Sequence, residues 1–245
     1  MCQIFSLDGD RAGNFVRIEN ALGEAKAGGA EIACLPETAL LGWVNPDAHK
    51  RAFPIPGADS TRLCKLAKAH DIYLCAGLEE KDCGKLYDSA VLIDSQGRIL
   101  LKHRKIILLA ELMTPPYAPG ESVDAVETQF GKIGLLICAD THENNILKRM
   151  AALKPDLLIV PYGYAAKEDE WPVHGKQLEK VVKNTARKTG AFVVGTNLVG
   201  EITNGPWRGR VYGGQSVAAD NDGRTISIAK DRDRDINVFN IDVGL

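Results

Sequence analysis

The sequence predicts an α/β fold in which helices cover mixed β-sheets. Short apolar runs typical of strands alternate with amphipathic helical patterns along the chain. Some neighbouring strand runs are joined by tight turns, as in hairpins, and others are separated by a helix, as in crossover connections. These observations leave two arrangements open. Helices cover one mixed sheet, or two sheets pack face to face between helices.

The N-terminal half is expected to begin with a strand over residues 2–7. A helix follows with Phe15, Ile18, Leu22 and Ala25 on one face, and Gly28-Gly29 ends it. A buried strand covers residues 31–35, and Asp59 or Ser60 can cap the next helix. The pattern then predicts three strands, over residues 72–78, 87–94 and 98–105.

The C-terminal half opens with a loop over residues 108–120, which carries three prolines. Helices are expected over residues 146–152 and 175–188, because apolar side chains recur there at helical spacing. The other apolar runs are strands, over residues 123–128, 132–138, 157–163, 191–200, 212–220, 224–230 and 236–243. The chain has no linker and no internal repeat, so we expect one domain over residues 1–245.

Composition excludes several classes of protein. The formal net charge of −2 gives no electrostatic reason to expect nucleic acid or an anionic membrane as partner. The chain lacks any run near the roughly 18 apolar residues of a membrane span, and MCQIFSLDGD does not resemble a signal peptide. The six cysteines form no CxxC and the five histidines no HxxxH, so we expect a cytoplasmic protein without a metal or other cofactor.

Cys138 is the first candidate for chemistry. It ends the apolar run KIGLLIC and precedes ADTHENN, which is expected to open a helix. The positive end of a helix dipole lowers the pKa of a thiol, and the thiolate is the nucleophile. The alternative is a small core residue, since free cysteines are often buried.

Glu37 and Lys105 also follow predicted strands. Glu37 lies in CLPETALLGW, where burial would raise its pKa toward that of a general base. Lys105 precedes an apolar run and can hold a carboxylate or donate to an oxyanion. The alternatives are a surface loop for Glu37 and a solvated basic patch for Lys105. Together with Cys138, the two residues place an acid, a cation and a thiol at the carboxyl ends of three strands, where ligands gather in α/β folds.

Three blocks carry a resemblance to a known family: LPETALLGW, GKLYDSAVLIDSQGRILLKHRKIIL and GKIGLLICAD. Their order and setting resemble the Glu–Lys–Cys blocks of the nitrilase, or carbon–nitrogen hydrolase, superfamily, and the segments after Cys138 are similar as well. The resemblance implies a four-layer αββα sandwich of two mixed sheets covered by helices, and a homodimer formed through its helical faces. It implies that Glu37 is the general base, Lys105 the transition-state stabiliser and Cys138 the nucleophile.

Further site residues follow from the same resemblance. Many members carry a second glutamate after the lysine, and Glu111 fits that place better than Glu121. The backbone N–H of Ala139 would stabilise the oxyanion together with Lys105. Aromatic residues near the blocks are candidates to bind substrate: Trp43, Tyr117 and Tyr162. Asp140 either contacts substrate or caps the following helix together with Glu143.

The residues after the cysteine bear on the substrate. This chain reads Ala139-Asp140, where true nitrilases usually have Trp-Glu, so the resemblance favours a small amide or N-carbamoyl compound over a nitrile. The alternatives within the family are a nitrilase, an acyltransferase and a non-catalytic scaffold protein. Gly214-Gln215-Ser216-Val217-Ala218 is a near match to the nucleophile elbow of serine hydrolases. That motif needs a strand, a turn and a helix, whereas Ser216 falls inside a predicted strand, so the sequence argues against a serine hydrolase.

Overall fold

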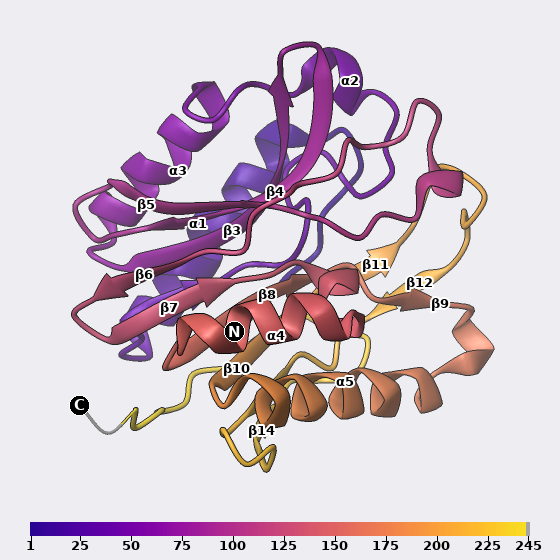
Figure 1. Cartoon of the computed structure of the whole chain (residues 1–245). Coiled ribbons are helices and arrows are strands. Elements are labelled where there is room, and N and C mark those ends of the chain that lie inside the picture. The colour runs from indigo at the N-terminus through magenta and orange to yellow at the C-terminus, as the bar shows by residue number, and fades with distance from the viewer. Residues whose placement is uncertain (244–245) are drawn as a thin grey trace.

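The computed structural model describes residues 1–243 and has four layers, in the order helix, sheet, sheet, helix (Figure 1). One sheet has four strands, in the order β2 (Ile32–Cys34), β3 (Tyr73–Asp82), β4 (Lys85–Ile93) and β5 (Ile99–Arg104). Its β2–β3 pair is parallel and its other two pairs are antiparallel. This sheet is therefore mixed, as predicted.

The second sheet has six strands, in the order β14 (Thr225–Ile228), β13 (Val217–Ala219), β10 (Phe192–Asn197), β8 (Leu157–Tyr162), β7 (Gly131–Leu135) and β6 (Ala125–Thr128). Its three central strands β7, β8 and β10 run parallel, and the outer pairs are antiparallel. The predicted four-layer sandwich of two mixed sheets is confirmed.

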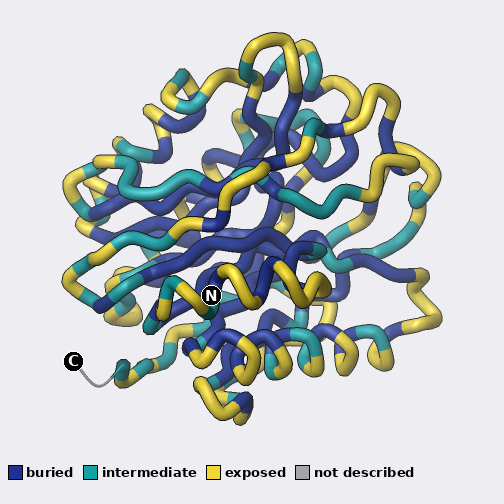
Figure 2. The backbone as a smooth tube through the Cα atoms, in the orientation of Figure 1, coloured by how far each residue is buried: buried dark blue, intermediate teal, exposed yellow. Residues whose placement is uncertain are grey.

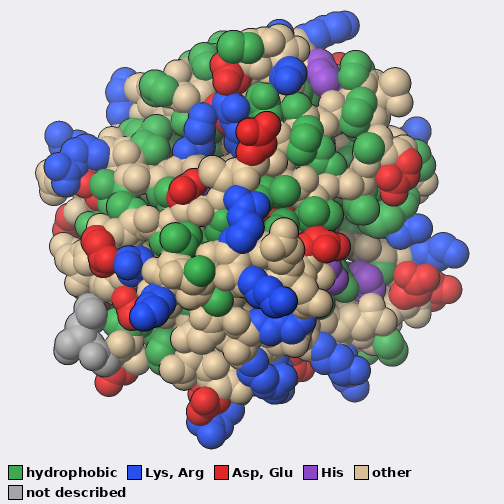
Figure 3. All heavy atoms as spheres, in the orientation of Figure 1, with side chains coloured by type: hydrophobic (Ala, Val, Ile, Leu, Met, Phe, Trp, Pro, Cys, Tyr) green, Lys and Arg blue, Asp and Glu red, His purple; other side chains and the backbone are tan. Residues whose placement is uncertain are grey.

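Two helices cover each sheet. α1 (Arg11–Ala27) and α3 (Ala58–Ala69) pack on the four-stranded sheet, and α4 (Asn144–Leu153) and α5 (Val173–Thr189) pack on the six-stranded sheet. Strand residues between the layers are buried, whereas loops and the outer sides of the helices are exposed (Figure 2). Figure 3 shows lysine and arginine side chains along the exposed sides of α4 and α5. No helix in the described part of the chain has both the length and the apolar character of a membrane span.

The remaining elements are short: α2 (Ala48–Arg51), β1 (Cys2–Gln3), β9 (Ala165–Ala166), β11 (Val199–Glu201), β12 (Val211–Gly213), β15 (Asp235–Ile236) and the 3₁₀ turns η1 (Ala110–Leu112), η2 (Cys138–His142) and η3 (Glu168–Glu170). The strand predicted over residues 2–7 is reduced to β1, which pairs with β15. The predicted run 236–243 forms no strand beyond Ile236. β11, β12 and β9 form a small three-stranded sheet in that order.

The start of α3 differs from the prediction. The helix begins one residue before Asp59, whose carboxylate lies 3.2 Å from Arg11 Nε. Ser60 accepts a hydrogen bond from the backbone N–H of Gly57. The capping contact therefore joins Ser60 to Gly57, and Asp59 pairs with α1 instead.

Gly77 in β3 decides how the segment after β2 crosses the four-stranded sheet. The backbone N–H of Ala39 donates to Gly77 O at 3.0 Å. A Cβ at Gly77 would lie 2.5 Å from Pro36 O and 2.7 Å from Glu37 Cα. Only glycine lets these two backbones approach so closely.

We therefore predict that Gly77→Ala lowers the free energy of unfolding by about 1–3 kcal/mol, because the added methyl group meets rigid backbone. The matched control is Gly23→Ala in α1, where a Cβ would meet only His70 Cε1, at 3.7 Å. That substitution should stabilise the helix by about 0.5–1 kcal/mol. Urea denaturation measures both changes, and an unchanged free energy for Gly77→Ala would contradict the crossing.

Candidate active site

Glu37, Lys105 and Cys138 meet between the two sheets. Lys105 directly follows β5, Glu37 lies three residues after β2, and Cys138 lies three residues after β7. The ammonium of Lys105 donates a short hydrogen bond to Glu37 Oε1, and both side chains are buried, at 2% and 0% exposure. The two alternatives of a surface loop for Glu37 and a solvated basic patch for Lys105 are therefore excluded.

The Glu37 segment (residues 35–39, after β2) passes over the neighbouring strand β3. β2 and β5 lie at opposite edges, with β3 and β4 between them. The segment crosses β3 at Gly77, and the Glu37 side chain meets the ammonium of Lys105, whose backbone follows β5. The backbone N–H of Glu37 also donates to Tyr162 O, at the end of β8 in the other sheet. Glu37 thus joins both sheets.

The two carboxylate oxygens of Glu37 differ in their surroundings. Oε1 accepts the bond from Lys105, whereas Oε2 has no hydrogen-bond partner among the described residues. A Cβ at Gly163 would lie 2.9 Å from Oε2, so the glycine leaves this oxygen room. A buried carboxylate oxygen without a donor is costly unless a proton or a ligand satisfies it.

Cys138 occupies a strained turn. Its φ is +41°, in the left-handed region that non-glycine residues rarely adopt. The hydroxyl of Thr141 donates to Cys138 O at 2.7 Å and lies 3.1 Å from the Tyr162 hydroxyl. Strain of this kind persists where surrounding contacts enforce it and is concentrated at functional sites.

The pKa of the Cys138 thiol differs from the sequence-based expectation. Burial and the negative charge of Glu37 raise the pKa, and they outweigh Lys105 and the backbone N–H of Gly163, which lower it. The expected net lowering was wrong, because burial and Glu37 dominate and because Cys138 opens the 3₁₀ turn η2 rather than α4. The resting thiol is therefore neutral at pH 7 and needs a base to remove its proton.

Lys105 stays charged in spite of its burial. Desolvation lowers its pKa, but the raising effects, of which the negative charge of Glu37 is the largest, outweigh it, so the net shift is upward. Its Nζ lies 3.4 Å from Asp88 Oδ2 and 5.4 Å from the ring centroid of Trp43. The ammonium is thus a fixed positive charge beside the cysteine turn.

Asp140 holds the segment that begins at Lys105 (residues 105–120, the lysine loop) against the turn η2 that begins at Cys138 (the cysteine turn). Its Oδ1 accepts from the backbone N–H groups of Ile106 and Ile107, both at 2.9 Å. Its Oδ2 accepts from Ile137 N at 3.1 Å and lies 2.8 Å from His103 Nε2. Both oxygens of this buried carboxylate are occupied by these four contacts. The predicted substrate contact and the predicted cap with Glu143 are therefore replaced by a positioning role.

The other predicted residues lie at different distances from the reaction centre. Trp43 and Tyr117 are buried near it, and the Tyr117 hydroxyl has no hydrogen-bond partner among the described residues. Tyr162 is fully buried, and its hydroxyl lies 3.1 Å from that of Thr141, so its contact with substrate stays a prediction. Ala139 follows Cys138 and is partly exposed, as an oxyanion donor requires. Its role, like that of Trp43 and Tyr117, stays a prediction.

Glu111 is not brought to Lys105. It lies exposed in η1, and no hydrogen bond or ion pair of its carboxylate is seen within residues 1–243. The second carboxylate beside Lys105 is Asp88, on β4. The predicted place for Glu111 is thus taken by a residue from a different element.

Sequence reasoning missed Asp88, His103, Gly163 and Tyr212. Asp88 is a charged residue inside an apolar strand run, and this was a usable signal. His103 and Gly163 gain their roles through contacts with Asp140 and Glu37, which no local pattern reveals. Tyr212 is buried, and its hydroxyl has no hydrogen-bond partner among the described residues.

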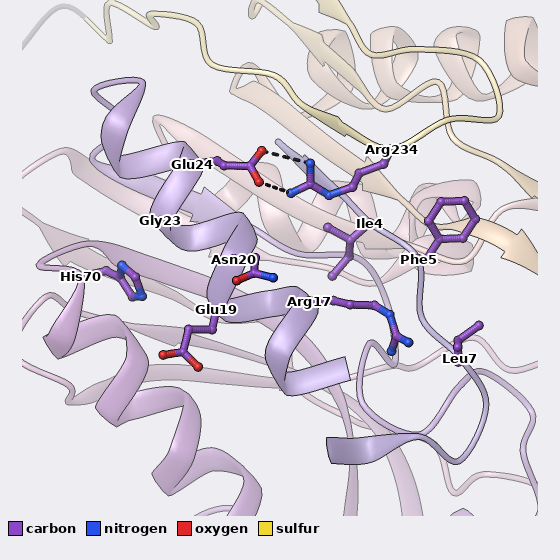
Figure 4. Close-up of a pocket in the computed structure, with 10 residues that line it drawn as sticks. All are labelled: Ile4, Phe5, Leu7, Arg17, Glu19, Asn20, Gly23, Glu24, His70 and Arg234. Carbon is purple, nitrogen blue, oxygen red and sulfur yellow. Dashed lines mark hydrogen bonds and ion pairs between the residues drawn. The ribbon is translucent and has the colours of Figure 1, made fainter. Parts of the chain in front are cut away.

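Two cavities lie away from the triad. A hollow of about 770 Å³ lies between the N-terminal segment and α1 and is bordered by the Glu24–Arg234 ion pair (Figure 4). A cavity of about 270 Å³ lies near Met1, Cys34 and Phe130. Neither is lined by a triad residue, so the candidate site rests on side-chain geometry and chemistry rather than on cavity size.

Metal and serine chemistry find no support in the described residues. Residues 1–243 contain no cluster of three or more His, Cys, Asp or Glu side chains suited to a metal ion. Ser216 is fully buried, and its hydroxyl donates to Gln3 Oε1 at 2.9 Å. It precedes a strand rather than a helix, so this segment does not form a nucleophile elbow.

Comparisons with known proteins point in one direction. The carbon-nitrogen hydrolase family matches residues 1–245. An (R)-stereoselective amidase from Pseudomonas sp. is 29% identical over 92% of this chain and 78% of its own length. An omega-amidase from Xenopus laevis is 31% identical over 62% of this chain, and a bifunctional nitrilase/nitrile hydratase from Nicotiana tabacum is 27% identical over 77%. These two alignments span only 58% and 57% of the relatives' own lengths.

Solved structures show the same fold. An amidase from Nesterenkonia sp. superposes with a TM-score of 0.82 at 21% identity, covering 96% of this chain and 86% of that one. A variant of the Nesterenkonia sp. AN1 amidase, with the same TM-score, identity and coverage, shows covalent addition of the acetamide moiety of fluoroacetamide at its active site cysteine.

The hydrogen bonds of Asp140 give a stability prediction. Asp140→Ala leaves the N–H groups of Ile106, Ile107 and Ile137 without their acceptor, so the free energy of unfolding should fall by roughly 3 kcal/mol or more. Asp10→Ala is the matched control, because this partly exposed carboxylate caps α1 and its loss should cost less. Equal losses in chemical denaturation would contradict the role of Asp140.

Proposed function

Because the chain belongs to the carbon-nitrogen hydrolase family, we propose that it cleaves the non-peptide C–N bond of a small amide or N-carbamoyl compound through a thioester at Cys138. One observation carries the proposal. A thiol, an ammonium and a carboxylate from three separate segments meet in a dry site, and the carboxylate keeps one oxygen without a donor.

The free oxygen of Glu37 makes it the base. The Cys138 thiol is neutral at rest, since burial and the Glu37 charge raise its pKa. Glu37 takes the thiol proton while sulfur attacks the carbonyl carbon and forms the C–S bond. The electron pair of the carbonyl moves onto oxygen, and Lys105 and the backbone N–H of Ala139 stabilise that charge.

Collapse of the tetrahedral intermediate breaks the C–N bond. Glu37 returns its proton to the leaving nitrogen, so ammonia or an amine departs and the acyl group stays on sulfur. Glu37 then takes a proton from water as the water attacks the thioester, and Cys138 recovers its proton when the acid leaves. One base thus serves both halves of the reaction, and Lys105 stays protonated throughout, because its pKa is raised.

The surroundings suit a small, uncharged substrate. Trp43, Tyr117 and Tyr212 are buried near the triad, and both tyrosine hydroxyls lack a hydrogen-bond partner among the described residues. An amide group offers the complementary donor and acceptor atoms to such hydroxyls. A charged substrate would lose its hydration without a counter-ion in this site.

Amides are preferred over nitriles on two grounds. First, the cysteine is followed by Ala139-Asp140, where true nitrilases usually have Trp-Glu, and Asp140 binds the lysine loop and the cysteine turn. Second, the relative with the longest coverage among those described above is an amidase, and the structural neighbours are amidases. The tobacco nitrilase keeps nitriles as the second candidate class.

The homodimer through the helical faces stays a prediction. α4 and α5 present their polar sides outward, with Lys176, Lys180 and Lys183 on α5. We propose two partners, the small substrate and a second copy of the chain.

The substrate class is tested by ammonia release over amides, N-carbamoyl compounds and nitriles. We expect turnover of amides or N-carbamoyl compounds by the wild type and its loss in Cys138→Ala, because no other group replaces the nucleophile. Cys83→Ala is the matched control, since Cys83 is exposed and lies outside the site. Turnover of nitriles alone would overturn the amide preference, and activity near wild type in Cys138→Ala would overturn the mechanism.

A further inference from the structure

We propose that Asp88 is a positioning residue that stands protonated in the resting enzyme and donates a hydrogen bond to the Glu37 carboxylate. Asp88 lies on β4, and its Oδ2 is 3.4 Å from the Lys105 ammonium that also binds Glu37. Asp88 acts through Glu37, whose orientation it fixes, and does not touch the reacting atoms. The proposal rests on the proposed function only for its kinetic readout.

Asp88 is buried without enough donors for an ionised carboxylate. Its side chain has 0% exposure, and neither oxygen has a hydrogen-bond partner among the described residues. Its closest cation, Lys105 Nζ, lies 3.4 Å away and donates its short bond to Glu37 instead. A proton on Asp88 makes one oxygen a donor, and the Glu37 carboxylate is an acceptor beside it.

Charge balance in the site leads to the same conclusion. If both Asp88 and Glu37 were ionised, a single ammonium would face two buried carboxylates. Burial, followed by the negative charge of Glu37, raises the pKa of Asp88 far more than Lys105 lowers it. Two carboxylates that share a dry site cannot both keep their charge at low cost, so one holds a proton.

Other groups around Asp88 do not change this balance. Six titratable side chains of the described residues surround it. They are Glu37 after β2, Glu79 on β3, Lys105 and Tyr117 in the lysine loop, Cys138 in the cysteine turn and Tyr212 on β12. Among them only Lys105 is a cation. Burial raises the pKa of Glu79 and of both tyrosines, so these three side chains stay neutral and do not alter the charge balance.

The hydrogen bond from Asp88 supplies what the base needs. Lys105 donates to Glu37 Oε1 from the end of β5, and a protonated Asp88, 3.4 Å from the same ammonium, donates to the Glu37 carboxylate from β4. A carboxylate accepts about four hydrogen bonds, so an acceptor site remains for the thiol proton. Two donors on rigid strands prevent the carboxylate from turning away from Cys138. A displacement of about 1 Å in such a group can cost on the order of 100-fold in rate.

Asp88→Asn and Asp88→Ala separate this role from that of a counter-ion. The asparagine amide keeps one donor for Glu37 and one acceptor for Lys105, as a protonated carboxyl does. We expect Asp88→Asn to keep kcat within about threefold of wild type, and Asp88→Ala to lose about 100-fold. The alkaline limb of the pH profile should move to higher pH in Asp88→Asn, because ionisation of Asp88 no longer contributes to it.

Two readouts need no substrate. The infrared difference spectrum of wild type minus Asp88→Asn at pH 7 should contain the carbonyl band of a protonated carboxylic acid, and Glu79→Gln should retain that band. The melting temperature of Asp88→Asn should exceed that of wild type by more at pH 8 than at pH 5. A raised folded-state pKa makes the wild type lose stability as pH rises toward it.

Asp94→Asn is the matched control for melting. Asp94 follows the same strand, and hydrogen bonds from Arg98 outweigh its burial and lower its pKa. This control should melt at a lower temperature than wild type. The proposal is overturned if Asp88→Asn loses the activity that Asp88→Ala loses, fails to fold, or removes a carboxylate band instead of a carbonyl band. If wild type hydrolyses no compound, the infrared and melting results still decide the state of Asp88.

Discussion

The buried ion pair between Lys105 and Glu37 is the interaction on which the rest of the site depends. Both charges are removed from water, and loss of either partner would leave the other uncompensated, at a cost of about 3–5 kcal/mol. The pair can form only because the Glu37 segment crosses β3 at Gly77 and because Asp140 ties the lysine loop to the cysteine turn. The fold therefore stabilises the arrangement that chemistry requires.

Much of the architecture follows from local sequence patterns. The helical spacing of Phe15, Ile18 and Leu22 predicts α1, and a similar pattern predicts α5. Glu37, Lys105 and Cys138 each come at the carboxyl end of an apolar run. The pattern therefore predicts that their side chains lie together at the edge where ligands bind in α/β folds. The four-layer sandwich came from the resemblance, since periodicity alone left one sheet or two open.

Other features depend on contacts between distant segments and were not predictable from local patterns. Asp140 resembles a helix cap in the sequence. In the structure its Oδ1 instead accepts hydrogen bonds from Ile106 and Ile107, which lie more than thirty residues earlier in the chain. The thiol pKa depends on burial and on Glu37, both of which outweigh the local turn. Asp88 replaces Glu111 beside Lys105, because register in β4 brings it there while the loop carries Glu111 to the surface.

The most direct test of the account is mass spectrometry of the enzyme quenched during turnover. If the ion pair positions Glu37 as base for Cys138, the peptide that contains Cys138 should carry the acyl group of the substrate. The mass increase should disappear when the substrate is exhausted, because water hydrolyses the thioester. Turnover that leaves Cys138 unmodified at every quench time, or an acyl group on another residue, would contradict the account.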